Sequence, residues 1–236
     1  MKQYSDTMVK NILSRIHIYY FISFAYMVVS FVLGAILNNF LVIFLAWNMF
    51  LATLVFLISN VLVYLYKKKA SLWILLLGLG LWILVFPNSI YMLTDFIHIQ
   101  NYTFFIRYAD IYNYSLSEWF VFAHILIGAL YAAKLGISAI HVLETEVKKH
   151  TQGFHYIILS LLFVLSSFGI FLGRFLRFNS WNFIEVISDI GRAFSHGYFL
   201  IGFVGLFFVL HWAMYFLFSN KECNINIESN HKSEEK

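Results

Sequence analysis

The chain has 236 residues, of which 61% are hydrophobic and 12% are charged, whereas a soluble domain has roughly 45–50% apolar and about 25% charged residues. A soluble fold of this size cannot bury so much apolar surface, but membrane helices can turn it toward lipid because their backbone groups pair internally. The net charge of +4 comes from lysines in short segments between long apolar runs, which favours a role in membrane topology over nucleic-acid binding. The single cysteine, Cys223, excludes an intrachain disulfide.

The apolar runs predict an all-α integral membrane helical bundle with about six transmembrane helices. The first run is longer than the roughly 7–15-residue core of a signal peptide, so we interpret it as a retained span. The expected spans cover about residues 16–37, 41–66, 72–93, 119–140, 156–172 and 198–218, within one transmembrane domain of residues 1–218. Pro87 interrupts the third span, which we expect to continue with a kink. The polar tail, residues 219–236, is expected to be disordered and cytoplasmic.

Two longer connections and a pattern of small residues complete the predicted organisation. Residues 95–117 are rich in tyrosine and phenylalanine, whereas residues 173–197 place apolar side chains at helical spacing. The second pattern predicts an amphipathic helix in the outer membrane interface. Gly128, Ala132 and Gly136 recur every four residues in the fourth span, which favours close packing within the molecule.

Basic residues predict the orientation, because lysine and arginine concentrate in cytoplasmic segments. With the N-terminus inside, six spans return the C-terminus to the cytoplasm and place residues 67–69, 148 and 149 there, all lysines. The basic residues expected outside are all arginines: Arg107, Arg174, Arg177 and Arg192. The preference for positive charge in the cytoplasm does not explain arginines in the outer segments. These arginines therefore suggest a function on the outer side of a bacterial plasma membrane.

The first polar motif lies near the outer end of the third span and contains Asp95 and His98. Residues three apart share a face of a helix. A carboxylate beside an imidazole can orient the ring and raise its basicity, so the pair is a candidate catalytic acid/base site. The same pair could supply two metal ligands, although we predict no metal site. A polar helix end with a local hydrogen bond explains the same spacing.

The second polar motif closes the fifth span and contains Arg174 and Arg177, again three residues apart. Two guanidinium groups on one face suit a phosphate or a carboxylate, which they bind in bidentate fashion. Alternatively, the arginines reach toward lipid headgroups, with Trp181 as an interfacial residue. They could also pair with an outer carboxylate such as Asp95 and join the two connections without any substrate.

Two histidines lie inside predicted spans. His124 is about a turn and a half inside the outer end of the fourth span, where ionisable residues usually face the bundle interior. It would either complete a site with Asp95 and His98 or form a hydrogen bond to a neighbouring helix. His211 lies deeper, in the inner half of the sixth span, and we expect it to serve packing or an interhelical hydrogen bond.

The two motifs read P-N-S-I-Y-x-x-T-D-F-x-H from Pro87 and G-R-F-L-R-F-N-S-W-N from Gly173. Together they resemble the DUF1361 family of bacterial multi-pass membrane proteins, over roughly residues 40–218. The resemblance implies a membrane bundle but no reaction. Family members tend to have proline at the position of Ile90 and aspartate at that of Asn182. The motif positions that carry over are Pro87, Asn88, Tyr91, Thr94, Asp95, His98, Gly173, Arg174, Arg177, Asn179, Ser180 and Trp181.

Three functions fit these residues. The outer patch would bind or process an anionic lipid or envelope precursor, with protons handled by Asp95 and His98. The residues expected to contact that substrate are Asn88, Tyr91, Arg174, Arg177, Asn179 and Trp181. A small-solute transporter is the alternative, favoured by the intramembrane histidines and the break at Pro87, and a non-catalytic membrane accessory protein is the third. The lipid bilayer is the expected partner, and nothing in the sequence identifies a cofactor.

Overall fold

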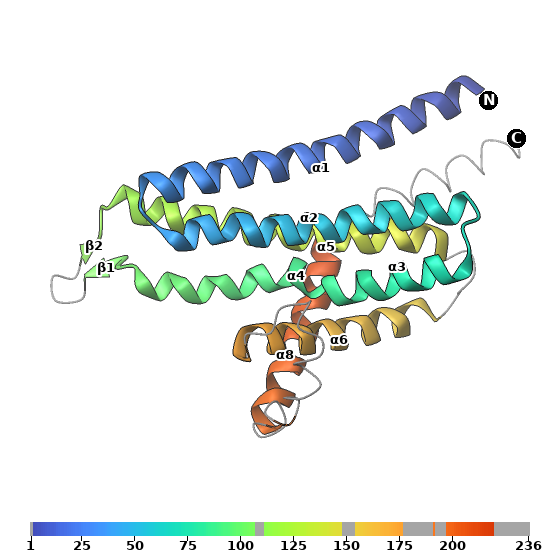
Figure 1. The fold of residues 1–236 in the computed structure, drawn as a ribbon. Helices are drawn as coiled ribbons and strands as arrows, with labels where there is room; N and C mark the ends of the chain where they lie inside the picture. Colours follow the sequence, from blue (N-terminus) through green and yellow to red (C-terminus); the bar gives the residue numbers. More distant parts are fainter. Residues whose placement is uncertain (1, 107–110, 148–153, 177–190, 192–196, 220–236) are drawn as a thin grey trace, which may run out of the picture.

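The computed structural model describes the chain apart from residues 1, 107–110, 148–153, 177–190, 192–196 and 220–236 (Figure 1). The helices are α1 (Lys2–Ile36), α2 (Phe40–Lys67), α3 (Leu72–Val85), α4 (Pro87–Tyr91), the 3₁₀ helix η1 (Met92–Asn101), α5 (Leu116–Val147), α6 (His155–Phe175) and α8 (Gly197–Phe218). Strands β1 (Phe105–Ile106) and β2 (Ile111–Tyr112) pair as a short antiparallel hairpin.

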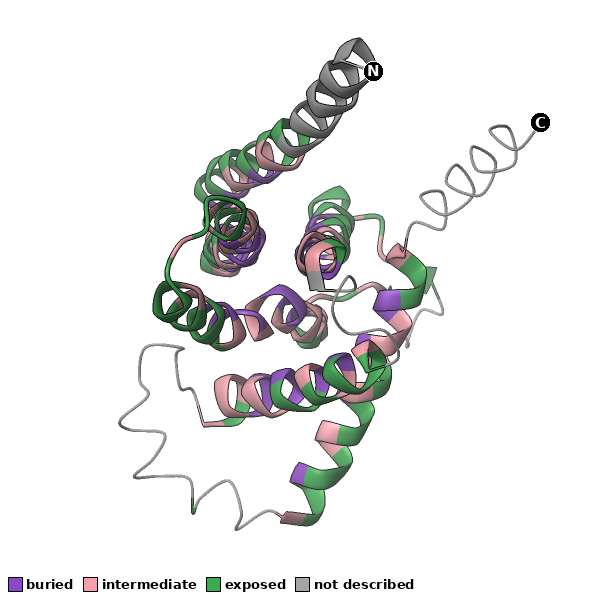
Figure 2. Ribbon diagram, turned by 90° about the vertical axis from the view of Figure 1, so that its right-hand side faces the viewer, coloured by how far each residue is buried: buried purple, intermediate pink, exposed green. Residues whose placement is uncertain are grey.

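The predicted all-α membrane bundle is confirmed. Six helical stretches among the described residues are long and apolar enough to cross a membrane: 17–36, 40–67, 72–101, 116–146, 155–175 and 197–218. Large apolar side chains cover their outward faces, for example Phe21, Trp73 and Ile201, each more than 70% exposed. Figure 2 shows the buried residues on the faces that the helices turn toward one another. Such a surface suits lipid as its solvent.

Two tight turns mark opposite ends of the bundle. Asn38 joins α1 to α2 with a φ of 48°, a left-handed conformation that asparagine tolerates better than most residues. The side chain of Asn39 then caps α2 by accepting a hydrogen bond from the Leu41 amide at 3.1 Å. We call this end, which also carries the β1–β2 hairpin, the hairpin end. The α2–α3 turn, with lysines at positions 67–69, lies at the opposite end, called the lysine end (Figure 1).

The third helical stretch is broken into α3, α4 and η1. Pro87 takes the first position of α4, where its missing amide hydrogen costs least, so the helical path continues past Pro87 as a new helix. It continues further than the expected residue 93, because η1 runs for ten residues to Asn101. A 3₁₀ helix of that length is uncommon. Its residues Met92 and Asp95 are buried, and it packs against α2 and α5.

Small residues bring α4 and η1 against the neighbouring helices. A Cβ atom added at Gly169 of α6 would lie 2.8 Å from Cγ of Pro87, and one at Gly136 of α5 would lie 2.2 Å from Oγ of Ser89. These contacts confirm that the spacing of glycine and alanine in the fourth span serves packing within the molecule.

Helix α8 is inclined steeply to α2, α3 and α5 (Figure 1). Its first half packs on α6 through aromatic rings, with Phe175 lying 5.1 Å between ring centroids from both Phe199 and Phe203. The amphipathic interfacial helix expected within residues 173–197 and the polar tail lie outside the described residues.

Candidate functional site

A buried ion pair joins η1 to α6. Asp95 has no exposed surface, and its Oδ1 accepts a hydrogen bond from Nη2 of Arg174 at 2.6 Å. Its Oδ2 accepts a second one from Nδ2 of Asn48 in α2 at 2.7 Å. Because both oxygens are bonded and the charge is compensated, the carboxylate can remain ionised inside the bundle. Of the alternatives for Arg174, the structure therefore shows the pairing with an outer carboxylate.

Arg174, in the last turn of α6, is held on a platform made by α4 and η1. Its Nε donates to Oγ1 of Thr94 at 2.8 Å, and its Nη2 also donates to that oxygen. The guanidinium carbon lies 4.7 Å from the centroid of the Tyr91 ring, a cation–π distance. Thr94 in turn donates to the Tyr91 carbonyl at 2.6 Å. The plane and direction of the guanidinium are thus fixed by Thr94, Asp95 and Tyr91.

One edge of this guanidinium is left over. Nη1 forms no hydrogen bond to any residue that the structure describes, and the Arg174 side chain is 17% exposed. An arginine has five N–H donors, so two remain on Nη1 for another acceptor. An internal salt bridge alone does not require such an edge, which no described residue uses.

The cluster lies well inside the bundle. Asn48 is eight residues from the start of α2, or about 12 Å at 1.5 Å per residue. Tyr102, whose hydroxyl accepts from Asn39 at the hairpin end, follows Asp95 by seven residues, or about 14 Å at the 3₁₀ rise of 2.0 Å. Both paths place the Asp95–Arg174 pair about 12–14 Å along the helices from the hairpin end.

His98 lies one 3₁₀ turn beyond Asp95, toward the hairpin end. In a 3₁₀ helix, side chains three residues apart eclipse one another, and the charges of the two residues interact. No hydrogen bond joins His98 to Asp95 among the described residues, and the bonds of Oδ1 and Oδ2 of Asp95 go to Arg174 and Asn48. The two residues are therefore neighbours, but not a hydrogen-bonded acid/base pair.

The remaining predicted contact residues fall into two groups. Asn88 donates through Nδ2 to the carbonyl of Val85 at 2.9 Å, and Tyr91 lies under Arg174. Arg177, Asn179 and Trp181 lie outside the described residues. The described part of the chain contains no group of three or more His, Cys, Asp or Glu residues that could hold a metal ion, so Asp95 and His98 have no third ligand there.

His124 does not join this cluster. Its Nε2 lies 2.8 Å from Oγ of Ser30 in α1, and its ring stacks on Tyr26 at 4.4 Å between centroids. The Tyr26 hydroxyl donates to the His124 carbonyl at 3.0 Å. Of the two expectations for this histidine, the hydrogen bond to a neighbouring helix is the one that the structure shows.

His211 joins α8 to α6, as expected. It is fully buried, and its Nδ1 lies 2.7 Å from the carbonyl oxygen of Phe207. Because a carbonyl oxygen only accepts, Nδ1 carries the proton, and Nε2 accepts from the Ser166 hydroxyl at 2.8 Å.

Replacing Ser166 with alanine should leave Nε2 of His211 buried without a donor. We expect a loss of about 0.6–2 kcal/mol, the range measured for interhelical hydrogen bonds in membranes, visible as a lower midpoint of thermal unfolding in detergent. Ser160→Ala is the matched control, because Ser160 lines an open groove and not the His211 contact. Equal midpoints for the two variants would show that the His211 bond contributes nothing.

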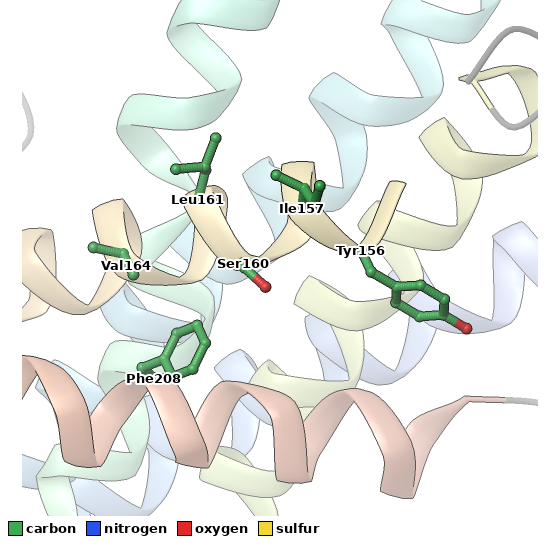
Figure 3. Close-up of a pocket in the computed structure, with 6 residues that line it drawn as sticks. All are labelled: Tyr156, Ile157, Ser160, Leu161, Val164 and Phe208. Atoms are coloured by element: carbon green, nitrogen blue, oxygen red, sulfur yellow. The ribbon is translucent and has the colours of Figure 1, made fainter. Parts of the chain in front are cut away.

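That groove lies between α6 and α8, where the two helices diverge (Figure 3). It is open, has a volume of about 330 Å³, and is lined by Tyr156, Ile157, Ser160, Leu161, Val164 and Phe208. It holds few polar groups, so it lacks the convergent donors of a specific site.

Sequence reasoning missed Asn48, the residue that bonds the second oxygen of Asp95. Its signal was an amide in the middle of an apolar span, a residue type that forms interhelical hydrogen bonds in membranes. A second missed cluster lies toward the lysine end, where Glu144 accepts from the Tyr215 hydroxyl at 2.8 Å and lies 3.1 Å from Nδ1 of His141. Nearby in sequence, Glu146 pairs with Lys67 at 3.3 Å. These contacts close the bundle at its basic end.

The six apolar helices and the polar cluster buried between them define a multi-pass helical membrane protein. A family model described as "Protein of unknown function (DUF1361)" matches residues 47–217, and the chain belongs to this family. The matched region contains both polar motifs and Asn48. No curated protein and no solved structure matches the chain.

Proposed function

We propose that the protein binds the anionic headgroup of an amphiphile, such as a phosphorylated lipid, through Arg174. The observation that carries this proposal is the partly bonded guanidinium: Nε and Nη2 are fixed by Thr94 and Asp95, while Nη1 has no partner among the described residues. A guanidinium already held in one orientation loses little freedom when it binds a planar or tetrahedral anion.

The depth of the pair favours an amphiphile over a free ion. Both a soluble anion and a lipid headgroup would have to leave water to reach a site about 12 Å along α2, but the chains of the lipid stay in apolar surroundings and add to the free energy of binding. Arg177, three residues further along the chain, would supply a second guanidinium. Asn179, Trp181 and Asn88 remain the other proposed contacts.

Binding is favoured over turnover by the state of Asp95. A general base must reach the proton that it removes, whereas Asp95 is fully buried and its charge is stabilised by hydrogen bonds from Arg174 and Asn48. A proton-transfer role for Asp95 and His98 requires this pair to open first.

Lipid binding can be measured by native mass spectrometry of the purified protein with dihexanoyl phosphatidylglycerol, and with dihexanoyl phosphatidylcholine as a zwitterionic comparison. We expect the wild type to prefer phosphatidylglycerol. The double variant Arg174→Gln/Asp95→Asn keeps hydrogen-bonding groups of similar shape but removes both charges, and it should bind phosphatidylglycerol at least tenfold more weakly. Lys68→Gln, which removes an exposed charge at the lysine end, should bind normally. Unchanged preference in the double variant would refute the proposal.

A transporter for a small organic anion is the second candidate. The broken helix α3–α4–η1 favours it, because interrupted helices beside buried charges form the binding sites of many transporters. Proteoliposome uptake of radiolabelled glycerol 3-phosphate that is abolished in the same double variant would favour this candidate. Binding without uptake would favour the lipid site, including that of a non-catalytic accessory protein.

We propose the plasma membrane as the location, with both termini in the cytoplasm and the hairpin end outside. In a Cys223→Ser background, a cysteine replacing the exposed Tyr112 of β2 should react with an impermeant maleimide in intact cells. A cysteine replacing Lys68, in the α2–α3 turn, should react only after the membrane is opened. The reverse labelling would invert the orientation and place the Arg174 site nearer the cytoplasmic leaflet.

A further inference from the structure

We propose that Asp95 takes up one proton as the anion binds to Arg174. The inference rests on the proposed function, because it concerns the same site. In this step Nη1 of Arg174 donates a hydrogen bond to the anion, and a proton from solvent adds to Asp95. The neutral carboxyl group of Asp95 can still accept the hydrogen bond from Nη2 of Arg174.

Charge balance in a buried site is the reason for the coupling. Arg174 and Asp95 together carry no net charge, and Asp95 has no exposed surface. A monoanion added without a proton would leave one uncompensated negative charge in the interior, which is strongly unfavourable. Proton uptake restores neutrality, so it accompanies anion binding.

Among the residues that the structure describes, the groups around Asp95 offer no second fixed cation. The group from α6 is Arg174 itself, whereas α2 contributes the neutral amide of Asn48. Tyr91 of α4, Tyr26 of α1 and His98 of η1 itself lie within electrostatic range of Asp95. Of these described groups, Arg174 alone carries a permanent positive charge. A charge that Arg177 supplied in place of the proton would give binding without proton uptake.

Asn48 is suited to both states of Asp95. Its Nδ2 donates to the ionised carboxylate at 2.7 Å, and the oxygen of the same amide can accept a hydrogen bond from a protonated carboxyl group. Asn48 can therefore form a hydrogen bond with either protonation state of Asp95. A lysine at this position would compensate the carboxylate and remove the need for a proton.

The test is isothermal titration calorimetry with dihexanoyl phosphatidylglycerol, a lipid that stays a monoanion near neutral pH. Titrations at one pH in two buffers with different ionisation enthalpies give the number of protons taken up per lipid bound. We expect about one for the wild type, with the Kd rising about tenfold for each unit of pH increase, as linkage requires. Dimethyl phosphate, which carries the same phosphodiester without chains, shows whether the headgroup chemistry alone suffices.

Two variants locate the proton. Asp95→Asn resembles the neutral carboxyl group, so it should take up no proton and bind the lipid more tightly than the wild type at pH 8. His98→Gln should still take up one proton, and loss of uptake in this variant would assign the proton to His98 and overturn the inference. If Asp95→Asn does not fold, the pH dependence of the wild-type Kd alone decides whether anion binding is coupled to proton uptake.

The outcomes separate the two proposals. Absence of binding by the wild type for both lipid and dimethyl phosphate would refute the proposed function. Binding with no proton uptake and a pH-independent Kd would refute the coupling and leave the proposed function standing.

Discussion

Replacing Arg174 with alanine should destabilise the protein by about 3–5 kcal/mol, the range for removing one partner of a buried ion pair. The loss is large because Asp95 is fully buried and would keep only the Asn48 hydrogen bond. The Tyr91 ring and the Thr94 hydroxyl would lose their contacts with the guanidinium as well. Thermal or denaturant unfolding in a mild detergent measures the difference.

A double-mutant cycle separates the ion pair from the packing of the arginine. Asp95→Asn removes the partner charge, so Arg174→Ala in that background should cost clearly less than in the wild type. Lys134→Ala is the matched control, because it removes an exposed basic side chain from α5. Equal costs of Arg174→Ala in both backgrounds would show that the pair contributes nothing to stability.

Replacing Gly136 with alanine should destabilise the protein by about 1–3 kcal/mol, the usual cost of forcing a methyl group into a packed interior. The added Cβ would lie 2.2 Å from Oγ and 2.6 Å from Cβ of Ser89. The Ser89 Cβ is fixed to the backbone of α4, so the helix itself must shift. Because Tyr91 lies in the same short helix, we expect lipid binding at Arg174 to weaken too.

Gly202 of α8 provides the control for this prediction. A Cβ atom there meets nothing within 4 Å, so Gly202→Ala should leave the unfolding midpoint and lipid binding unchanged. If Gly136→Ala were as stable as Gly202→Ala, the close approach of α5 and α4 would not exist in the folded protein.

Much of the fold could be predicted because its signals are local. Apolar runs reveal membrane helices directly, and the tight turn between the first two helices falls on asparagines, a residue type that tolerates its left-handed conformation. The helical path does continue past Pro87, but as the new helices α4 and η1 and not as the same helix. The extension of η1 to Asn101 was missed because its polar residues resemble a loop, whereas they are accommodated against α2 and α5.

The candidate site was predicted in its parts, and the pairing of its charges was predicted only as one alternative among several. The sequence singled out Asp95 and Arg174, yet they are 79 positions apart and no local pattern shows that their charges meet. For the same reason, the sequence did not show that Asn48, which comes from a third helix, contacts Asp95. The expected partnership of Asp95 with His98 followed from spacing, and spacing shows a shared face without showing which neighbour takes the hydrogen bonds.

The most direct measurement of the central claim is a ¹⁵N–³¹P contact between the Arg174 guanidinium and a bound lipid phosphate. Protein labelled with ¹⁵N-arginine, reconstituted with phosphatidylglycerol, can be examined by solid-state NMR dipolar recoupling, and Arg174→Lys assigns the signal. We predict that ³¹P dephases a guanidinium signal which is absent in the lysine variant. Dephasing that persists unchanged in Arg174→Lys, or no dephasing of any arginine, would contradict the binding of an anionic headgroup at Arg174.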